Sequence, residues 1–317
     1  MPSTPFDKTA YLARIGLPPV ADDFVVSEAD SFSFLQRVVA HHRQAIPFEN
    51  LALCRVFPID PAHVTHATER ISVDRVVQKL VTDRRGGYCY EQNTLLALAL
   101  RAFGYDVDTL LSRMTTVGAS EDRPRVVRLK GLNHMILLVR LHGARYLCDV
   151  GFGGRGQPPA PLVLDETPIV ETPGGEVYQL RQVAIQRVIS SATPALGDFV
   201  VVDKSLKADD DPIMWAVYYQ TQNHGECHAS YVFSTAYSVA QADISNANWK
   251  TSTSPTSILS KVPVVVKRTD AGLFTLHDKT FKHIEHGQVV ESRIVDSHDE
   301  LIVVLRDTFG LHAPILD

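Results

Sequence analysis

The sequence predicts an α+β fold with a helical N-terminal part, a central antiparallel sheet or small barrel, and a mixed C-terminal part. Three observations lead to this prediction. Apolar residues recur at helical spacing through the first hundred residues. After Gly104, short runs rich in β-branched and aromatic residues are separated by Gly, Pro and Asp, a pattern typical of antiparallel strands. The last third combines such runs with one closing helical pattern, so the 317 residues are expected to form two or three domains.

Helices are expected through most of the first 104 residues. A short helix opens at residues 11–15, and the apolar spacing of residues 31–44 predicts a longer one that Pro47 ends. Residues 71–81 form another amphipathic pattern. Residues 91–103 are apolar on nearly every face, which is typical of a central, buried helix, and the glycine that follows favours a helix end there.

Strands are expected in the middle of the chain and again near its end. The β-rich runs of the middle part cover residues 107–114, 126–129, 134–141, 146–150, 177–180 and 199–202. A polar stretch at residues 203–212 then marks a predicted boundary. Beyond it, strands are expected at residues 264–266, 272–276 and 288–294, followed by a closing helix at residues 297–308.

Composition and charge argue against several classes of protein. The formal net charge of −5 and an isoelectric point near 6.2 disfavour a nucleic-acid partner, which would require a basic stripe. The most apolar helical stretch, residues 94–103, has about half of the ~20 residues that a membrane helix needs. Four cysteines, in a chain with no visible secretion signal, favour free thiols in a reducing compartment. We therefore expect a cytoplasmic protein that binds neither nucleic acid nor a membrane.

Cys89, in the run RRGGYCYEQN, has the surroundings of a reactive thiol. It precedes the apolar helix predicted from residue 91, and a cysteine at a helix start meets unpaired backbone N–H groups and the positive end of the helix dipole. Both features stabilise a thiolate. Gly86 and Gly87 allow the backbone to approach a ligand closely. The alternative is a buried structural cysteine, which is common, and the residues around Cys89 leave both interpretations open.

His134 and Asp149 are predicted to meet on one face of a hairpin. If His142 and Gly143 form a two-residue turn, the numbers of paired residues add up to 285, and His134 then faces Gly151. Asp149 lies two positions from that pair, on the same face of the sheet. An aspartate inside an apolar strand needs a partner. The two side chains therefore suit the base and the orienting group that a nucleophilic cysteine requires, although a satisfied sheet histidine and a turn aspartate remain the alternative.

These motifs resemble those of the arylamine N-acetyltransferase family. The most specific part is RGGxCxExN in residues 84–93, followed by a histidine and by DVGFGG at residues 149–154. YLARIG near the N-terminus, IPFENL at residues 46–51, STSP at residues 252–255 and a C-terminal helix ending in FGL also fit. The resemblance covers nearly the whole chain.

The resemblance implies a three-domain fold. Residues 1–104 would form a helical bundle that carries the cysteine, and residues 105–205 an antiparallel β-barrel that carries the histidine and the aspartate. These two domains would resemble the core of papain-like cysteine proteases. Residues 206–230, the least family-like part, would be an interdomain segment with a possible insertion, and residues 231–317 an α/β lid.

The resemblance also implies a reaction and its residues. Cys89, His134 and Asp149 would form a catalytic triad that passes an acyl group, acetyl before others, from acyl-CoA through S-acyl-Cys89 to an arylamine, arylhydrazine or arylhydroxylamine. The aromatic ring of Phe48 would line the acceptor pocket. Two further pairs would be structural: Glu49 with Arg85 as an ion pair, and Gly151 with Gly153 in a tight loop beside the site. Acyl-CoA would be a co-substrate, no metal would be needed, and the protein would be a monomer or a weak homodimer.

Two other patterns are interpreted differently. Residues 151–156 formally contain GxGxxG, but the prolines within residues 157–161 exclude the helix that a dinucleotide site needs next. Residues 224–228, HGECH, suggest a metal, but their spacing is cramped and no second ligand pair is evident, so a metal is not expected.

The triad leaves several reactions open. The donor can be propionyl- or malonyl-CoA instead of acetyl-CoA. The same three residues also serve a cysteine hydrolase of amides and an amide synthase that closes a macrolactam. A catalytically silent binding protein is the alternative from a different functional class.

Overall fold

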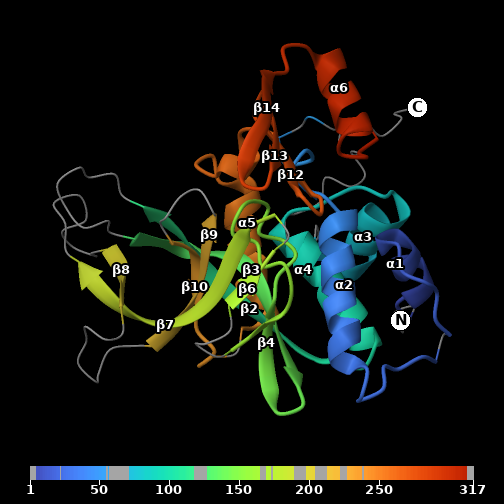
Figure 1. The fold of residues 1–317 in the computed structure, drawn as a ribbon, viewed down its shortest axis with the longest axis vertical. Coiled ribbons are helices and arrows are strands. Elements are labelled where there is room, and N and C mark those ends of the chain that lie inside the picture. The colour runs from blue at the N-terminus through green and yellow to red at the C-terminus, as the bar shows by residue number, and fades with distance from the viewer. Residues whose placement is uncertain are drawn as a thin grey trace.

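In the computed structural model, a helical start is followed by a central sheet and a mixed C-terminal part, in the predicted order (Figure 1). No helix among the residues described is both long and apolar enough to cross a lipid bilayer. The structure describes residues 5–21, 23–54, 56, 71–117, 127–164, 169–172, 174–188, 198–203, 213–221, 227–237 and 239–312.

The N-terminal helices are α1 (Lys8–Ile15), α2 (Ser31–Ala45), α3 (Val73–Val77), the π-helix Gln78–Thr82 and α4 (Cys89–Ala102). The amphipathic pattern predicted as one helix over residues 71–81 is thus divided into α3 and the π-helix. Helix α4 begins at Cys89, two residues before the predicted start, and Tyr88, the residue before it, is extended.

The central sheet is antiparallel and nearly closes into a barrel. Strands β2, β10, β9, β7, β8 and β3 neighbour one another in that order, and β2 pairs with β3 to complete the ring. Within the part of the chain that the structure describes, β3 and β8 pair through Arg128 and Val200. Strands β4 and β5 extend the sheet beyond β3, and β6 pairs with β7. The bounds are β2 (Asp106–Val117), β3 (Val127–Leu141), β4 (Ala144–Cys148), β5 (Leu162–Val163), β6 (Ile169–Glu171), β7 (Glu176–Val188), β8 (Asp198–Asp203), β9 (Ile213–Thr221) and β10 (His228–Phe233).

The hairpin formed by β3 and β4 has the predicted register. His142 and Gly143 form its two-residue turn, and both have positive φ, 51° and 76°, as the favoured hairpin turns require. Leu137 pairs with Cys148 and Leu138 with Leu147, so the paired numbers add up to 285. Strand β3 is one long strand, where two shorter strands were predicted.

Residues 206–230 differ from the predicted interdomain segment where the structure describes them. Strand β9 lies between β7 and β10 inside the sheet, and β10 begins at residue 228. Trp215, Ala216 and Val217 are all buried, so β9 has core on both faces and lacks the alternation that marks a half-exposed strand. Residues 206–212 and 222–226 lie outside the described residues.

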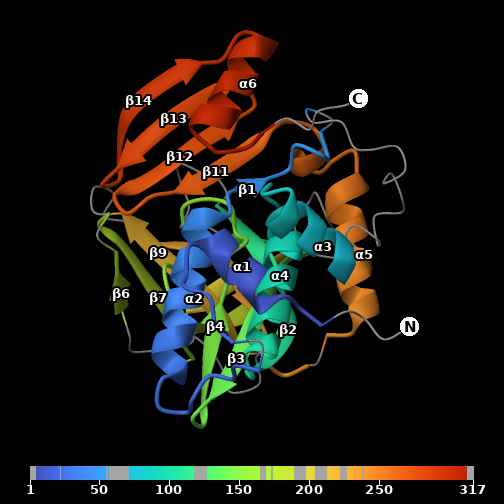
Figure 2. The same ribbon diagram turned by 90° about the vertical axis from the view of Figure 1, so that its right-hand side faces the viewer.

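A second antiparallel sheet forms the C-terminal part, and it includes a segment from the N-terminal part. Its order is β1-β11-β12-β13-β14, in which Phe48 of β1 pairs with Val266 of β11 (Figure 2). Helix α6 packs on this sheet through Val304 and Leu305. Helix α5 was not predicted. The bounds are β1 (Phe48–Glu49), α5 (Gln241–Thr253), the 3-10 helix Ile258–Ser260, β11 (Val264–Arg268), β12 (Gly272–His277), β13 (Thr280–Glu285), β14 (Gln288–Ile294) and α6 (His298–Asp307).

The largest hydrophobic core joins the helices to the outer face of the hairpin. Leu12 of α1, Val38 of α2 and Leu96 of α4 pack in one cluster with Leu137 and Val139 of β3. Full burial of such a side chain contributes about 1.5–3 kcal/mol. Helix α4 lies between the other helices and the strands (Figure 2), so this packing holds the residue at its start against the β3–β4 hairpin.

Candidate active site

Cys89 is the first residue of α4 and lies against the loop that follows β4. Its side chain is buried, with 5% exposed. A Cβ added to Gly151 would lie 2.7 Å from the Cα of Cys89, so only glycine permits this approach of the loop to the helix start. The helix start and the loop are therefore in direct contact.

His134 and Asp149 meet as the hairpin register predicts. The Nε2 of His134, on β3, lies 2.8 Å from the Oδ2 of Asp149, one residue past β4. Both side chains are almost completely buried. The other oxygen of Asp149, Oδ1, accepts hydrogen bonds from the Nδ2 of Asn93 at 3.0 Å and from the backbone N–H of Gly151 at 2.9 Å. The buried carboxylate is thus fully partnered.

The electrostatics of the pair favour charged forms of both side chains. Burial alone would raise the pKa of Asp149, but His134, Asn93 and the N–H of Gly151 lower it below its ordinary value. Burial would lower the pKa of His134, but the charge of Asp149, its hydrogen bond, and a hydrogen bond and charge of Cys89 raise it to about 10. At neutral pH the imidazole therefore carries a proton between a carboxylate and a thiol, an arrangement that supports a thiolate nucleophile.

Asn93 is a residue whose role the sequence did not reveal. It follows Cys89 by four positions on α4, so the two share one face of the helix. Its Nδ2 donates to the backbone oxygen of Met135 at 2.7 Å as well as to Asp149, and its Oδ1 accepts from the N–H of Val150 at 3.1 Å. One amide thus ties the helix to β3 and to the loop after β4. The available signal was its i+4 spacing from the cysteine within RRGGYCYEQN.

Two aromatic rings enclose His134. The ring of Phe152 lies 5.3 Å from the imidazole in an edge-on arrangement, and the ring of Tyr231, on β10, lies 5.0 Å from it. Burial, and next the charge of Asp149, raises the pKa of Tyr231 well above its ordinary value. These rings shield the imidazole from water, which strengthens its interactions with charged neighbours. Tyr231 was missed because β10 was not predicted.

Phe48 and Gly153 contact each other beside the site. Phe48 is buried in β1, with 9% exposed. A Cβ on Gly153 would lie 2.4 Å from the Phe48 ring, and Gly153 has a φ of 72°, which favours glycine. The loop that contains both Gly151 and Gly153 therefore bridges from the start of α4 to Phe48.

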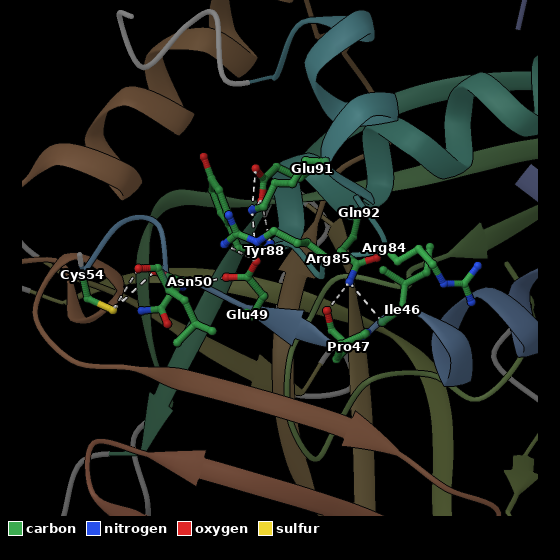
Figure 3. A network of polar contacts seen from close by, with 12 residues as sticks. Ile46, Pro47, Glu49, Asn50, Cys54, Arg84, Arg85, Tyr88, Glu91 and Gln92 are labelled. Atoms are coloured by element: carbon green, nitrogen blue, oxygen red, sulfur yellow. Dashed lines mark hydrogen bonds and ion pairs between the residues drawn. The ribbon is translucent and has the colours of Figure 1, made fainter. Parts of the chain in front are cut away.

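Glu49 and Arg85 form the ion pair that the resemblance implies. Arg85 donates from one Nη to Glu49 Oε1 at 3.1 Å, and Lys79 lies 3.3 Å from the same oxygen. Figure 3 shows Glu49 and Arg85 with Tyr88 and Glu91 at the turn before the helix. This cluster is built by β1, the π-helix, the RRGG turn and the first turn of α4.

The remaining sequence predictions concern thiols and metals. All four cysteines are free, as predicted. Among the described residues, no group of three or more His, Cys, Asp and Glu side chains is placed to hold a metal ion. His224, Gly225 and Glu226 of the HGECH run lie outside the described residues.

Comparisons with known proteins agree with this geometry. A family model described as N-acetyltransferase matches residues 31–315. An arylamine N-acetyltransferase of Mycolicibacterium smegmatis is 30% identical over 309 residues, which cover 96% of this chain and 92% of the relative. An N-malonyltransferase of Gibberella moniliformis is 32% identical over 182 residues, 54% of this chain and 46% of the relative. The solved structure of Mycobacterium marinum arylamine N-acetyltransferase in complex with CoA has a TM-score of 0.70 and 27% identity, and the match covers 96% of this chain and 92% of that one.

The similarity extends over the fold as well as the sequence. The M. marinum structure matches nearly the whole of this mixed helix and sheet fold, which includes the nearly closed barrel. The family model and the M. smegmatis relative both span most of the sequence. The chain therefore belongs to the arylamine N-acetyltransferase family.

Proposed function

We propose that the protein transfers an acyl group from an acyl-CoA to an arylamine through a thioester on Cys89. The observation that carries this proposal is the buried contact of Cys89 with His134, whose imidazole is held by Asp149 at 2.8 Å. A thiolate beside a positioned, protonated imidazole is suited to attack a thioester. CoA is bound in the related M. marinum structure, which supports an acyl-CoA as co-substrate.

In the first half-reaction, the Cys89 thiolate attacks the carbonyl carbon of the acyl-CoA. The new C–S bond places negative charge on the carbonyl oxygen, and backbone N–H groups at the start of α4 are suited to stabilise it. The intermediate collapses with cleavage of the bond to the CoA sulfur. His134 supplies its proton to the leaving thiolate, so CoA departs as a thiol and the imidazole becomes neutral.

In the second half-reaction, the arylamine nitrogen attacks the S-acyl group of Cys89. His134 accepts the proton from nitrogen, and the C–S bond breaks to restore the thiolate–imidazolium pair. Asp149 stabilises the imidazolium in both steps and fixes its orientation. Arylamines are neutral at pH 7, whereas alkylamines are mostly protonated, so the ping-pong scheme favours aryl acceptors.

The family arrangement suggests how substrates reach the thiol. We assign the helices of residues 1–104 and the barrel strands to a papain-like core, and the C-terminal sheet with α6 to a lid. Phe48 is proposed to line the acceptor pocket, since its ring packs against the loop that also contacts Cys89. We further propose that the protein acts in the cytoplasm as a monomer or weak homodimer.

Acetyl-CoA is the proposed donor, and malonyl-CoA is the second candidate. Most of the similar proteins reported above are arylamine N-acetyltransferases, but one is an N-malonyltransferase. Acetyl and malonyl groups differ by a carboxylate, so the two donors are separated by turnover of each CoA ester at equal concentration.

The test measures CoA release from acetyl-, propionyl- and malonyl-CoA with and without an arylamine. If the acyl group is transferred, CoA release depends on the arylamine, and one arylamine is acylated for each CoA released. A hydrolase instead releases CoA and free acid at the same rate without amine, and this result contradicts the proposal. Cys227→Ala, which removes an exposed thiol, is the control and retains turnover.

A further inference from the structure

A second group of buried charges lies against the start of α4, separate from His134 and Asp149. Lys79, in the π-helix, places its Nζ 2.9 and 2.8 Å from the two carboxylate oxygens of Glu91 and 3.3 Å from Glu49 Oε1. Arg85 binds the same oxygen of Glu49. The Glu49 side chain is fully buried, and 6%, 16% and 13% of the Glu91, Lys79 and Arg85 side chains are exposed. We call these four residues the Lys79 network (Figure 3 shows three of them).

The Lys79 network contacts the turn that leads into Cys89. Glu91, the third residue of α4, accepts a hydrogen bond of 3.1 Å from the backbone N–H of Tyr88, the residue immediately before Cys89. This is the N-terminal capping contact of the helix. The RGG turn packs directly on both carboxylates: a Cβ on Gly86 would lie 2.7 Å from Glu49 Cγ, and one on Gly87 2.8 Å from Glu91 Oε2. Both carboxylates therefore pack against the turn that immediately precedes the nucleophile.

Charge balance within the network depends on Lys79. Glu49 contacts two cations, Lys79 and Arg85, and these lower its pKa despite its burial. Burial raises the pKa of Glu91, Lys79 opposes this rise, and the negative charge of Glu49 adds to it. The guanidinium of Arg14 is directed instead to the backbone oxygens of residues 45, 80, 84 and 85. Without Lys79, two buried carboxylates would face each other at the end of the helix that carries the thiolate.

We propose that Lys79 is a positioning residue whose charge balances Glu49 and Glu91 and thereby holds the first turn of α4, and the potential around it, in the form in which Cys89 reacts. The inference rests on the proposed function in one respect, since it takes Cys89 as the nucleophile. Its consequence is specific to charge: removal of Lys79 places unbalanced negative charge near the thiolate, whereas removal of Lys79 and the charge of Glu91 together does not.

The test compares Lys79→Met, Lys79→Arg and the double variant Lys79→Met/Glu91→Gln with wild type. For each, we measure the pH dependence of alkylation of Cys89 by iodoacetamide, kcat/KM for acyl-CoA, and the thermal unfolding midpoint. Lys79→Met should raise the pH midpoint of alkylation by about one unit and lower kcat/KM by about tenfold at neutral pH. The double variant and Lys79→Arg should return both quantities to within a few-fold of wild type. Lys279→Met, at an exposed turn, is the matched control.

Three outcomes contradict the inference. In the first, Lys79→Met keeps the alkylation profile of wild type and only its unfolding midpoint falls, which would make Lys79 a merely structural residue. In the second, the double variant has the same alkylation midpoint and kcat/KM as Lys79→Met, which would show that unbalanced charge is not the cause. In the third, Lys79→Arg has the same alkylation midpoint and kcat/KM as Lys79→Met, which would show that a positive charge at this position does not restore the reactivity of Cys89. Because alkylation requires no substrate, these outcomes are separate from a failure of acyl transfer by wild type.

Discussion

The side-chain amide of Asn93 donates a hydrogen bond of 3.0 Å to Oδ1 of Asp149, so the helix that begins at Cys89 is tied to the carboxylate that holds His134. The nucleophile comes from the helical part of the chain, and the histidine and aspartate come from the sheet. Alignment of the three groups therefore depends on contacts between the two parts. Asn93 provides three such contacts with one side chain.

Asn93→Ala should lower both turnover and stability. The substitution leaves the Met135 oxygen, the Val150 N–H and one bond of Asp149 without this partner, at a cost of about 1–3 kcal/mol for each buried group left unpaired. Urea unfolding and kcat/KM measure the two effects. The control is Thr94→Ala, which alters the next residue on the same helix, and its turnover should fall by far less. Equal losses for the two variants would contradict a special role for Asn93.

Asp149→Asn should retain the fold and lose most of the turnover. The neutral amide removes the charge that raises the pKa of His134, so the imidazolium is no longer favoured at neutral pH. In a Ser-His-Asp triad the same change lowers kcat by about 10⁴-fold. The pH profile of Cys89 alkylation should change as well. Asp108→Asn removes an exposed aspartate and serves as the control. A variant with more than half of wild-type turnover and an unchanged profile would show that Asp149 is not the orienting group.

Gly153→Ala should impair use of the arylamine more than acylation by acyl-CoA. The added Cβ meets the Phe48 ring, and a left-handed conformation at a non-glycine residue costs roughly 1–2 kcal/mol. KM for the arylamine should therefore rise, while the rate of acyl-enzyme formation changes less. Gly154→Ala is a matched control, because a Cβ there has nothing within 4 Å. If both variants keep the wild-type KM, Phe48 and its loop do not form the acceptor wall.

His42 should make the fold sensitive to mild acid. It is fully buried, its Nδ1 contacts Tyr11 at 2.9 Å and its Nε2 contacts Gln92 at 2.9 Å. Burial, opposed by Gln92 and assisted by Arg14, lowers the pKa of His42 to about 4. In the unfolded chain histidine titrates near 6.5, so the unfolded state binds the proton first as pH falls from about 6.5 toward 4. Stability is complete above that window and falls within it by up to about 1.4 kcal/mol per pH unit.

The measurement is the free energy of unfolding in urea between pH 7 and pH 4. The His42→Gln variant should be less stable than wild type at pH 7 but should show a flatter decline toward pH 4. His41→Gln, at a half-buried neighbour, should keep the wild-type slope. His134 gives the opposite slope near pH 7, because its folded pKa of about 10 lies above the value of about 6.5 in the unfolded chain. Asp149, whose folded pKa is lowered, adds to the decline only at the acid end, where an aspartate of the unfolded chain titrates at about 3.9. The difference in slope between wild type and His42→Gln therefore isolates the contribution of His42. A slope unchanged in His42→Gln would assign the acid sensitivity elsewhere.

The contact of His134 with Asp149 was predictable because it depends on a short stretch of chain. A two-residue turn at His142 and Gly143 and the period of two along a strand together determine which residues share a face. The helix that follows Cys89 was predictable for a similar reason, since its apolar residues are continuous. Both signals are local.

The features that were missed depend on distant partners or lack a local pattern. Strand β9 is buried on both faces, so Trp215, Ala216 and Val217 show no alternation that would reveal a strand. Helix α5 has a weakly amphipathic sequence. Tyr231 reaches His134 only because β10 pairs with β2, which also pairs with β3. Asn93 binds groups 42 to 57 residues away in the chain, and the pattern of residues in its own helix does not indicate which groups these are.

The most direct test of the account is to trap the acyl group on the protein. Wild type is incubated with acetyl-CoA in the absence of an amine, and the intact protein and its peptides are measured by mass spectrometry. The account predicts one acetyl group, located on the peptide that contains Cys89, which is discharged when an arylamine is added. Cys89→Ala should acquire none, while Cys227→Ala should acquire it as wild type does. An acyl group on a different residue, or acetylation of the arylamine by Cys89→Ala at a rate near that of wild type, would contradict the assignment of Cys89 as the nucleophile.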